Sequence, residues 1–278
     1  MSAPNSSPLH WKPVSPPAPT TLRGRYVTLE PLQVERHTAA LWEAVRGQDE
    51  LWTWLADGPF STESELREAI AQKQRATDAV FLAIVPAEPR IPEGTGAFMP
   101  LKEGENAPAE TGIPEGAGAF MPLKESEDAR PAGPATSSAA KAAGYASYMR
   151  IEPAHGVVEV GNILLAPGLQ RTTAATEVMY LMGHHVFEDL GYRRYEWKCN
   201  ALNEPSRRAA LRLGFTFEGI FRQHMVIKDL NRDTAWFSML DHEWPARKRA
   251  FEAWLNPANF DETGNQRQSL TEIAETRR

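Results

Sequence analysis

The stretch "LAPGLQRTTAATEVMYLM", residues 165–182, changes from a turn to a helical pattern within a few positions. A Pro-Gly pair marks the turn, and the side chains from Thr172 to Thr176 are all short. Apolar residues with helical period begin at Val178. The first N–H groups of a helix have no partner within it and carry a partial positive charge, so they favour an anion. The pattern predicts a helix start that a pyrophosphate can approach closely, although short residues also occur there for capping alone.

The composition limits the class of protein. The 278 residues allow one large domain or two small ones, and 42% apolar with 24% charged residues are ordinary for a soluble globular protein. The net charge of −6 argues against nucleic acid as a partner, because a nucleic-acid binder needs a basic face. Cys199 is the single cysteine, which excludes an intrachain disulfide and suits the reducing cytoplasm. No apolar run reaches the roughly 20 residues of a membrane span, so we expect no membrane association.

The order of strand-like and helix-like patterns predicts a single α/β domain with a mixed sheet over residues 22–245. We expect strands at 26–32, 79–86, 144–153, 157–167 and 193–201, and a final hairpin at 222–228 and 234–240. We expect helices around 40–45, after a cap at Ser61 or Thr62, from 173 to 190 before Gly191, and from 203 to 214.

Three segments do not fit this domain pattern. Residues 1–21 are rich in proline, and we expect a flexible tail. Within 87–141, "IPEGTGAFMPLKE" (91–103) recurs as "IPEGAGAFMPLKE" (113–125), identical at twelve of thirteen positions. Two copies rich in Gly and Pro cannot build a solenoid, so we expect a disordered surface insertion, with docking through its Phe-Met pairs as the alternative. Residues 246–278 are charged, and we expect a helical or frayed tail there.

A second helix start carries the clearest motif, "NEPSRRAALRLGF", residues 203–215. Asn203 and Ser206 fall in its first turn, where both could serve only as caps. Together with the first helix start and the spacing before "LGF", they resemble the GCN5-related N-acetyltransferase (GNAT) superfamily, and most closely its RimJ/RimL-like branch. The resemblance begins at "LRGRYVTLEPL" (22–32) and skips the insertion. It implies a GNAT fold, with a mostly antiparallel central sheet that splays between two strands and is flanked by helices.

The resemblance also implies acetyl-CoA as cosubstrate. The family's pyrophosphate loop falls on residues 170–175, where Thr173 stands at a position usually occupied by glycine. Asn203 matches the residue that hydrogen-bonds the pantetheine arm, and Ser206 matches the hydroxyl near the thioester sulfur. Arg207 and Arg208 are candidates for the 3′-phosphate, or simply solvated surface charges. The implied cofactor-binding set is Leu164, Leu165, Gln170, Arg171, Thr172, Thr173, Ala174, Ala175, Asn203, Ser206 and Arg207.

Acetyl transfer to an amine places separate demands on the catalytic residues. An amine has a pKa near 10, so it must lose a proton before or during attack. Glu159 matches an acidic position of this branch and could take that proton directly or through water, or it could be only an ion-paired strand residue. The developing oxyanion needs an N–H donor, which by resemblance falls at Leu164 or Leu165. Ser206 would hydrogen-bond the leaving sulfur. Many relatives use a tyrosine in that role, so Tyr180 and Tyr195 are alternative candidates for it.

The acceptor pocket is harder to read from the sequence. Trp52, Trp54 and Phe60 lie in the segment that covers the acceptor groove of this family, and Tyr148 and Trp236 lie on strands that could floor it. For each of the five, packing in the core is the competing interpretation. His184 and His185 have no partners at metal-ligand spacing, so we expect no metal site.

These observations predict an acetyl-CoA-dependent N-acetyltransferase that acts on a primary amine by direct attack in a ternary complex. Cys199 has no neighbouring His-Asp support, which argues against a covalent acyl-enzyme. The acceptor could be a small amine or a protein N-terminus, and the chain a monomer or a homodimer. The alternative is a non-catalytic acyl-CoA-binding or scaffold protein with the same fold.

Overall fold

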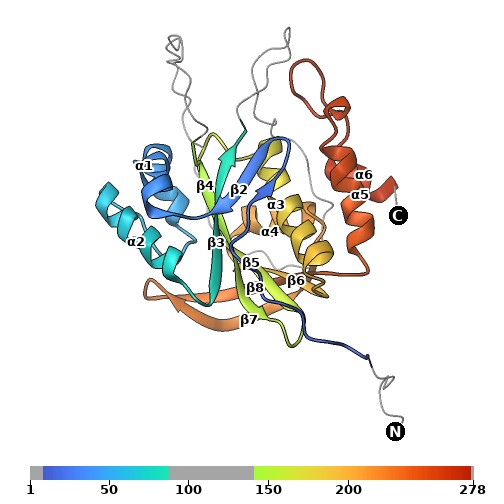
Figure 1. The fold of residues 1–278 in the computed structure, drawn as a ribbon, viewed down its shortest axis with the longest axis horizontal. Helices are drawn as coiled ribbons and strands as arrows, with labels where there is room; N and C mark the ends of the chain where they lie inside the picture. The colour runs from blue at the N-terminus through green and yellow to red at the C-terminus, as the bar shows by residue number, and fades with distance from the viewer. Residues whose placement is uncertain (1–8, 88–140, 277–278) are drawn as a thin grey trace.

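A computed structural model describes residues 9–87 and 141–276, which form a mixed α/β fold around one eight-stranded sheet (Figure 1). The strand order is β1-β2-β3-β4-β5-β6-β8-β7, and every neighbouring pair is antiparallel except β5 and β6. The strands are β1 (Leu22–Arg23), β2 (Val27–Pro31), β3 (Ala79–Pro86), β4 (Gly144–Glu152), β5 (Val157–Leu165), β6 (Arg194–Asn200), β7 (Thr216–Ile227) and β8 (Leu230–Leu240). The predicted α/β class with a mostly antiparallel sheet is confirmed.

Helices cover both faces of the sheet. Those of the described chain are α1 (Val34–Val45), α2 (Glu63–Arg75), α3 (Thr173–His184), α4 (Glu204–Arg212), α5 (Trp244–Trp254) and α6 (Leu270–Thr276), with short turns η1 (Asp49–Trp52), η2 (His185–Asp189) and η3 (Pro257–Asn259). Ala146 and Tyr148 of β4 pack in the cluster that includes α3 to α6, whereas Tyr145 packs with α1 and α2. Since side chains alternate along a strand, β4 separates two hydrophobic cores. We call the side with α3 the helix face and the other side the open face.

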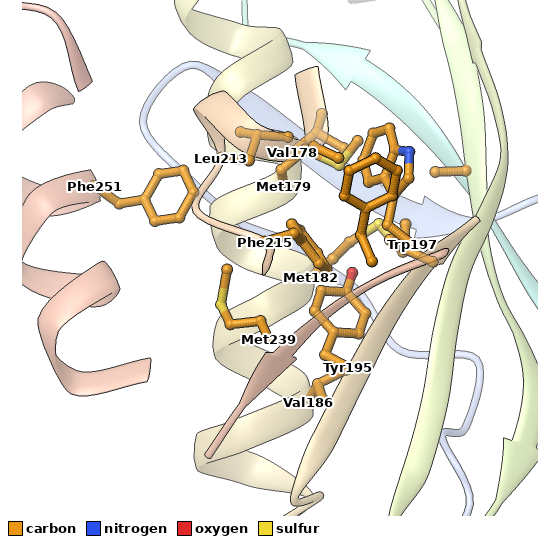
Figure 2. Packing of buried hydrophobic residues seen from close by; sticks show 14 of the residues in the cluster. Val178, Met179, Met182, Val186, Tyr195, Trp197, Leu213, Phe215, Met239 and Phe251 are labelled. Atoms are coloured by element: carbon orange, nitrogen blue, oxygen red, sulfur yellow. The ribbon is translucent and has the colours of Figure 1, made fainter. Parts of the chain in front are cut away.

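The larger core lies between α3 and the strands β6 and β8 (Figure 2). Val178 and Met182 project from α3 toward Tyr195 and Trp197 of β6, and all four are at most 6% exposed. Burying one large apolar side chain stabilises a fold by about 1.5–3 kcal/mol. The helical period that begins at Val178 is therefore the pattern that holds α3 on the sheet.

The sheet splays between β5 and β6, as the family resemblance implied. β5 pairs with β4 along its whole length, up to Leu165, but pairs with β6 only from Val157 to Val160. Beyond that point Asn162 adopts a positive φ of 49°, and the register of β5 with β4 shifts between Gly161 and Leu164. These irregularities turn the end of β5 away from β6 and open a gap in the sheet.

A buried carboxylate ties α3 to the start of β2. Glu177 is 5% exposed, and its oxygens accept the backbone N–H groups of Arg25, Tyr26 and Val27 at 2.9, 2.6 and 2.9 Å. A Cβ on Gly24 would lie 2.3 Å from the Glu177 carboxylate, so only glycine fits there. This contact fixes α3 against the sheet one turn after the helix start.

Both terminal segments differ from the expected tails. Residues 9–21 run along the domain: the Trp11 indole donates to the Ala154 carbonyl at 2.9 Å, and Val14 N–H donates to Pro153. At the other end, Phe251 and Trp254 are at most 2% exposed within the larger core. A few aromatic side chains among prolines and charges are therefore enough to pack each segment on the domain. The helical character expected for part of 246–278 is present in α5 and α6.

Other expectations were close to the structure. Thr62 caps α2 in a capping box with Glu65, and α3 continues through the π-helical turn η2 to a glycine with positive φ at Gly191. The last hairpin is longer than predicted, with its turn at Lys228 and Asp229. Residues 1–8 and both repeat copies lie outside the described residues. In the part that is described, no helix has the length and apolar character needed to cross a membrane.

Candidate functional site

The start of α3 is partly open to an anion. Thr172 is the N-cap, and its hydroxyl oxygen accepts the Ala175 N–H at 3.2 Å. The N–H groups of Thr173 and Ala174 have no hydrogen-bond acceptor within 9–87 and 141–276. The side chains of Thr172 to Ala174 are 3–8% exposed, so the helix start is less bare than the sequence indicated. Two amides with a positive helix end are a suitable donor set for one phosphate group.

The loop before α3 is held to the end of β5. The Gln170 side-chain amide donates to the Leu165 carbonyl at 3.0 Å, so this side chain stabilises the loop conformation. Arg171 is exposed and adopts a positive φ of 59°. This left-handed residue turns the chain into the helix start.

Strand geometry separates the two candidates for the acyl-oxygen donor. Ala166 N–H donates to the Ala143 carbonyl at the start of β4, and Leu164 lies two residues before Ala166 on the same edge of β5. Backbone groups alternate between the two edges of a strand, so the N–H of Leu165 faces the gap and that of Leu164 faces β4. Leu165 is therefore the suitable donor, and the buried Leu164 belongs to the smaller core.

The start of α4 brings Ser206 to the place where the strands separate. The Asn203 side-chain oxygen accepts the Ser206 N–H at 3.1 Å, so Asn203 is the helix cap. The Ser206 hydroxyl accepts the Trp197 indole N–H at 3.0 Å. Trp197 is the register partner of Val160, the last paired residue before the gap. Ser206 therefore stands over the gap on the helix face.

Cys199 lies near Ser206 but is not a prepared nucleophile. The thiol is 6% exposed, and burial raises its pKa, with a hydrogen bond to Ser206 acting in the opposite direction. A buried thiol with a raised pKa holds little of the reactive thiolate at neutral pH.

The two arginines of α4 that were candidates for the 3′-phosphate are not equivalent. Arg207 folds back onto the protein, with its side chain 14% exposed, its Nη1 3.2 Å from Glu204 and its guanidinium 5.9 Å from the Phe217 ring. Arg208 is more than half exposed and lies 3.5 Å from Glu204. Of the two, Arg208 has the accessibility that a phosphate partner needs.

Glu159 lies at the same point of the sheet as Ser206 but on the open face. Its side chain is 5% exposed, with Oε2 2.9 Å from Arg150 Nε and 2.8 Å from Lys198 Nζ. Burial raises the pKa of Glu159, while Lys198 and Arg150 act to lower it. Glu159 is the register partner of Glu196, the residue before Trp197 on β6. Glu159 and Ser206 thus flank the gap from opposite faces.

The sequence interpretation missed the ion pairs around Glu159. Lys198 also lies 2.7 Å from Glu196, Arg194 lies 2.6 Å from Glu196, and Arg194 makes two hydrogen bonds to Glu218. Burial raises the pKa of Glu196, but hydrogen bonds from Lys198 and Arg194 outweigh it, so the net direction is down. Arg194 also lowers the pKa of Glu218. The sequence signal for these ion pairs was "RRYEWKCN" (193–200), in which charged residues at 194, 196 and 198 alternate with apolar or aromatic ones and so share one face of a strand.

Aromatic side chains lie beside this network on β7 and β8. The Trp236 ring is 3.8 Å from Lys198 Nζ and 4.4 Å from the ring of Phe221, which is 52% exposed. His224 lies 5.9 Å from Trp236 and hydrogen-bonds Thr234. Trp236 therefore faces the open side, as an acceptor-pocket residue would.

Of the other acceptor-pocket candidates, some are buried in the core and one is partly exposed. Tyr148 is 1% exposed and donates to the Met182 carbonyl at 3.0 Å, so the prediction that it floors the pocket is wrong. Trp52 is 2% exposed and packs edge-on against Phe60, so its ring is a core residue. Trp54 is 39% exposed. The Trp52 carbonyl accepts from Lys228 at 2.9 Å, which joins this segment to the β7–β8 turn.

The arrangement suits two reactants that approach the gap from opposite faces of the sheet. On the helix face, two free amides at α3 and the Ser206 hydroxyl could hold a phosphorylated thioester; Leu165 N–H points into the gap. On the open face, a carboxylate and aromatic rings could meet a second reactant. These donors fit acetyl-CoA, whose diphosphate needs N–H groups and whose narrow arm needs a gap between strands.

Comparisons with known proteins also indicate an acetyltransferase. A family model, the acetyltransferase (GNAT) domain, matches residues 114–216. The chain is similar to a GCN5-related N-acetyltransferase from Brucella melitensis, with 38% identity and a TM-score of 0.75 over 96% of this chain and 99% of that one. It is also similar to a GNAT-family protein from Chromobacterium violaceum, with 30% identity and a TM-score of 0.64 over 88% and 98%.

Among curated proteins, a ribosomal-protein-serine acetyltransferase from Escherichia coli (strain K12) is 31% identical over 90 residues. The match covers 32% of this chain and 50% of that enzyme, so the similarity extends over only half of its length.

Proposed function

Because the chain belongs to the GCN5-related N-acetyltransferase family, we propose that it is an acetyl-CoA-dependent N-acetyltransferase that acts on a primary amine. One observation carries this proposal. Glu159 and Ser206 lie on opposite faces of the sheet at the point where β5 and β6 separate. An acid–base group on one side and a hydroxyl on the other are what an amine and a thioester need when they meet in the gap.

The cosubstrate site is proposed along the helix face. Acetyl-CoA supplies an acetyl group activated as a thioester. Thr173 and Ala174 N–H would bind its diphosphate, and Arg208 is placed to attract the 3′-phosphate. Leu165 N–H would donate to the acyl oxygen, where negative charge develops during attack.

The proton transfers are assigned to the two flanking residues. The amine nitrogen forms the new C–N bond as the C–S bond breaks, and the amine proton passes to Glu159 directly or through water. Burial raises the pKa of Glu159, which makes it a better proton acceptor than an exposed glutamate. The sulfur takes up a proton, and the Ser206 hydroxyl would stabilise it by a hydrogen bond.

The acceptor class follows less directly. The E. coli relative is named for ribosomal-protein acetylation, which supports a protein N-terminus as acceptor, although half of its length is unmatched. The open face with exposed Phe221 also leaves room for a small amine. We therefore keep both acceptors, a small amine and a protein N-terminus, within the proposed function.

A turnover screen tests the proposal. Release of free CoA from acetyl-CoA is measured with a panel of amines and N-terminal peptides, for wild type and for Glu159→Gln and Ser206→Ala. Both variants should lose at least tenfold in turnover while acetyl-CoA still raises their melting temperature, because a ligand at 100 times its Kd stabilises by about 2.7 kcal/mol. A melting shift without turnover for any amine would favour a non-catalytic acyl-CoA-binding protein. No melting shift would contradict both functions.

A further inference from the structure

The open face around Glu159 has a local charge that differs from the net charge of the chain. The ion pairs form one continuous row of alternating sign across the strands. The row consists of Arg150, Glu159, Lys198, Glu196, Arg194 and Glu218. It contains as many cations as carboxylates, so at neutral pH it carries no net charge.

Arg232 adds an uncompensated positive charge to this row. Among the described residues no carboxylate lies within ion-pair distance of Arg232, and its Nε is buried without an acceptor. Arg232 lies on β8 two residues before Thr234, which pairs with Asn200 at the end of β6. Burial lowers the pKa of Arg232, whereas the Glu159 carboxylate acts to raise it. A guanidinium does not lose its proton in a protein, so this charge persists at any working pH.

Arg150 is partly accessible and reaches toward β7, the strand that pairs with β8 at Arg232. Its side chain is 41% exposed, and its Nη2 lies 3.8 Å from the sulfur of Met225. Met225 is the register partner of Arg232 on β7. Met225 therefore neighbours Arg150 through its sulfur and Arg232 through strand pairing. Among the described residues, the carboxylate paired with Arg150 is that of Glu159, which Lys198 shares.

Aromatic rings border the same surface without adding negative charge. Trp236 and Phe221 pack 4.4 Å apart, and Phe221 is half exposed. Burial lowers the pKa of His224, and the nearby Arg150, Arg232 and Lys198 lower it further, so the ring is neutral at pH 7. The aromatic rings and the neutral His224 therefore leave Arg232 as the added charge beside a row of balanced ion pairs.

We propose that the acceptor is a primary amine that carries a carboxylate close to its amino group, with the carboxylate bound by Arg150 and Arg232. Arginine suits this role because its planar donors match a carboxylate in pairs. The remainder of the acceptor packs on Trp236 and Phe221, and its amino group is directed to Glu159. This inference rests on the proposed acetyltransferase function and narrows its substrate class.

Matched pairs of amines test the charge requirement. The kcat/KM for CoA release is measured for phenylalanine against phenethylamine, and for the peptides Asp-Phe-amide against Asn-Phe-amide. The first pair offers a carboxylate on a free amino acid, and the second offers it on the side chain of an N-terminal residue. At least one carboxylated acceptor should exceed its neutral partner about tenfold or more. The pair that shows the preference identifies the source of the carboxylate.

Variants connect the preference to the two arginines. Arg232→Gln should lower kcat/KM for the preferred carboxylated acceptor about tenfold and leave that for its neutral partner within about twofold. Arg150→Gln also removes an ion-pair partner of Glu159, so it should change kcat/KM for both acceptors and lower that of the carboxylated one about tenfold more. Arg232→Lys keeps the charge and should restore part of the preference even if the glutamine variant is poorly folded. Arg67→Gln, at an exposed arginine of α2 paired with Glu35, is the matched control and should change neither value.

Three outcomes would overturn the inference. Wild type could use the neutral amines as well as the carboxylated ones, or Arg232→Gln could lower both members of a pair equally. In either case amines are still acetylated, so the proposed function stands and only the acceptor class fails. If no amine of any class is acetylated, the proposed function fails and the inference fails with it.

Discussion

The carboxylate of Glu177 should contribute several kcal/mol to the stability of the fold. It accepts three backbone N–H groups, of which that of Val27 is buried and those of Arg25 and Tyr26 are partly accessible to water. Glu177→Ala would leave the Val27 donor without an acceptor, at a cost of about 1–3 kcal/mol. Water can replace the carboxylate at the other two, which adds about 1 kcal/mol each. We therefore expect a loss of roughly 3–5 kcal/mol in the free energy of unfolding.

Urea denaturation followed by circular dichroism measures this loss. Glu177→Gln keeps the shape and one acceptor oxygen, so its loss should be about half that of the alanine variant. Glu68→Ala, at an exposed glutamate on α2, is the matched control and should change the stability by less than about 0.5 kcal/mol. An alanine variant within about 1 kcal/mol of wild type would refute the idea that this carboxylate holds α3 to β2.

Three further predictions concern the ion pairs, the start of α3 and the buried thiol. Arg194→Met removes the main partner that lowers the pKa of Glu218 and the second partner, after Lys198, that lowers the pKa of Glu196. A lowered carboxylate pKa stabilises the fold above the ordinary value of about 4.3 and no longer does so in acid, so the variant should lose about 1 kcal/mol at pH 7 and match wild type near pH 3 in urea titrations. An equal loss at both pH values would contradict the ion-pair explanation. Thr173→Asp places a carboxylate at a helix start, so calorimetry should show at least tenfold weaker acetyl-CoA binding without a lower melting temperature, and unchanged binding would remove the diphosphate from this site. Burial raises the pKa of Cys199, so iodoacetamide at pH 8 should label the native protein about tenfold more slowly than the urea-unfolded chain; equal rates would show an open thiol.

The sequence was sufficient for features that depend on neighbouring residues. The caps at Thr62, Thr172 and Asn203 each hydrogen-bond a backbone N–H three residues later, so their geometry is contained in a four-residue motif. β3 pairs with β4 although residues 87–143 separate them, a pairing that the sequence pattern did not predict. The entropy of closing a loop rises only with the logarithm of its length, so a connection tenfold longer than usual costs only about 2 kcal/mol more.

The features that were missed depend on which strands become neighbours. The ion pairs of Lys198 require β5 and β6 to run parallel with Glu159 opposite Glu196, and nothing within β6 specifies that partner. The burial of the C-terminal helix α5 was missed for a different reason. Phe251 and Trp254 have helical spacing, but charged residues surround them and dominate the local composition.

Successive side chains of β6 point to opposite faces of the sheet, and in this way β6 contributes to both sides of the proposed site. Trp197 points to the helix face and donates to Ser206, whereas its neighbours Glu196 and Lys198 point to the open face and meet Glu159. Because the side-chain period of a strand is two residues, a shift of β6 by one residue would exchange these groups between the faces. The buried residues of β6 in the larger core oppose such a shift. The packing that stabilises the fold therefore also keeps the hydroxyl and the carboxylate on opposite sides of the gap.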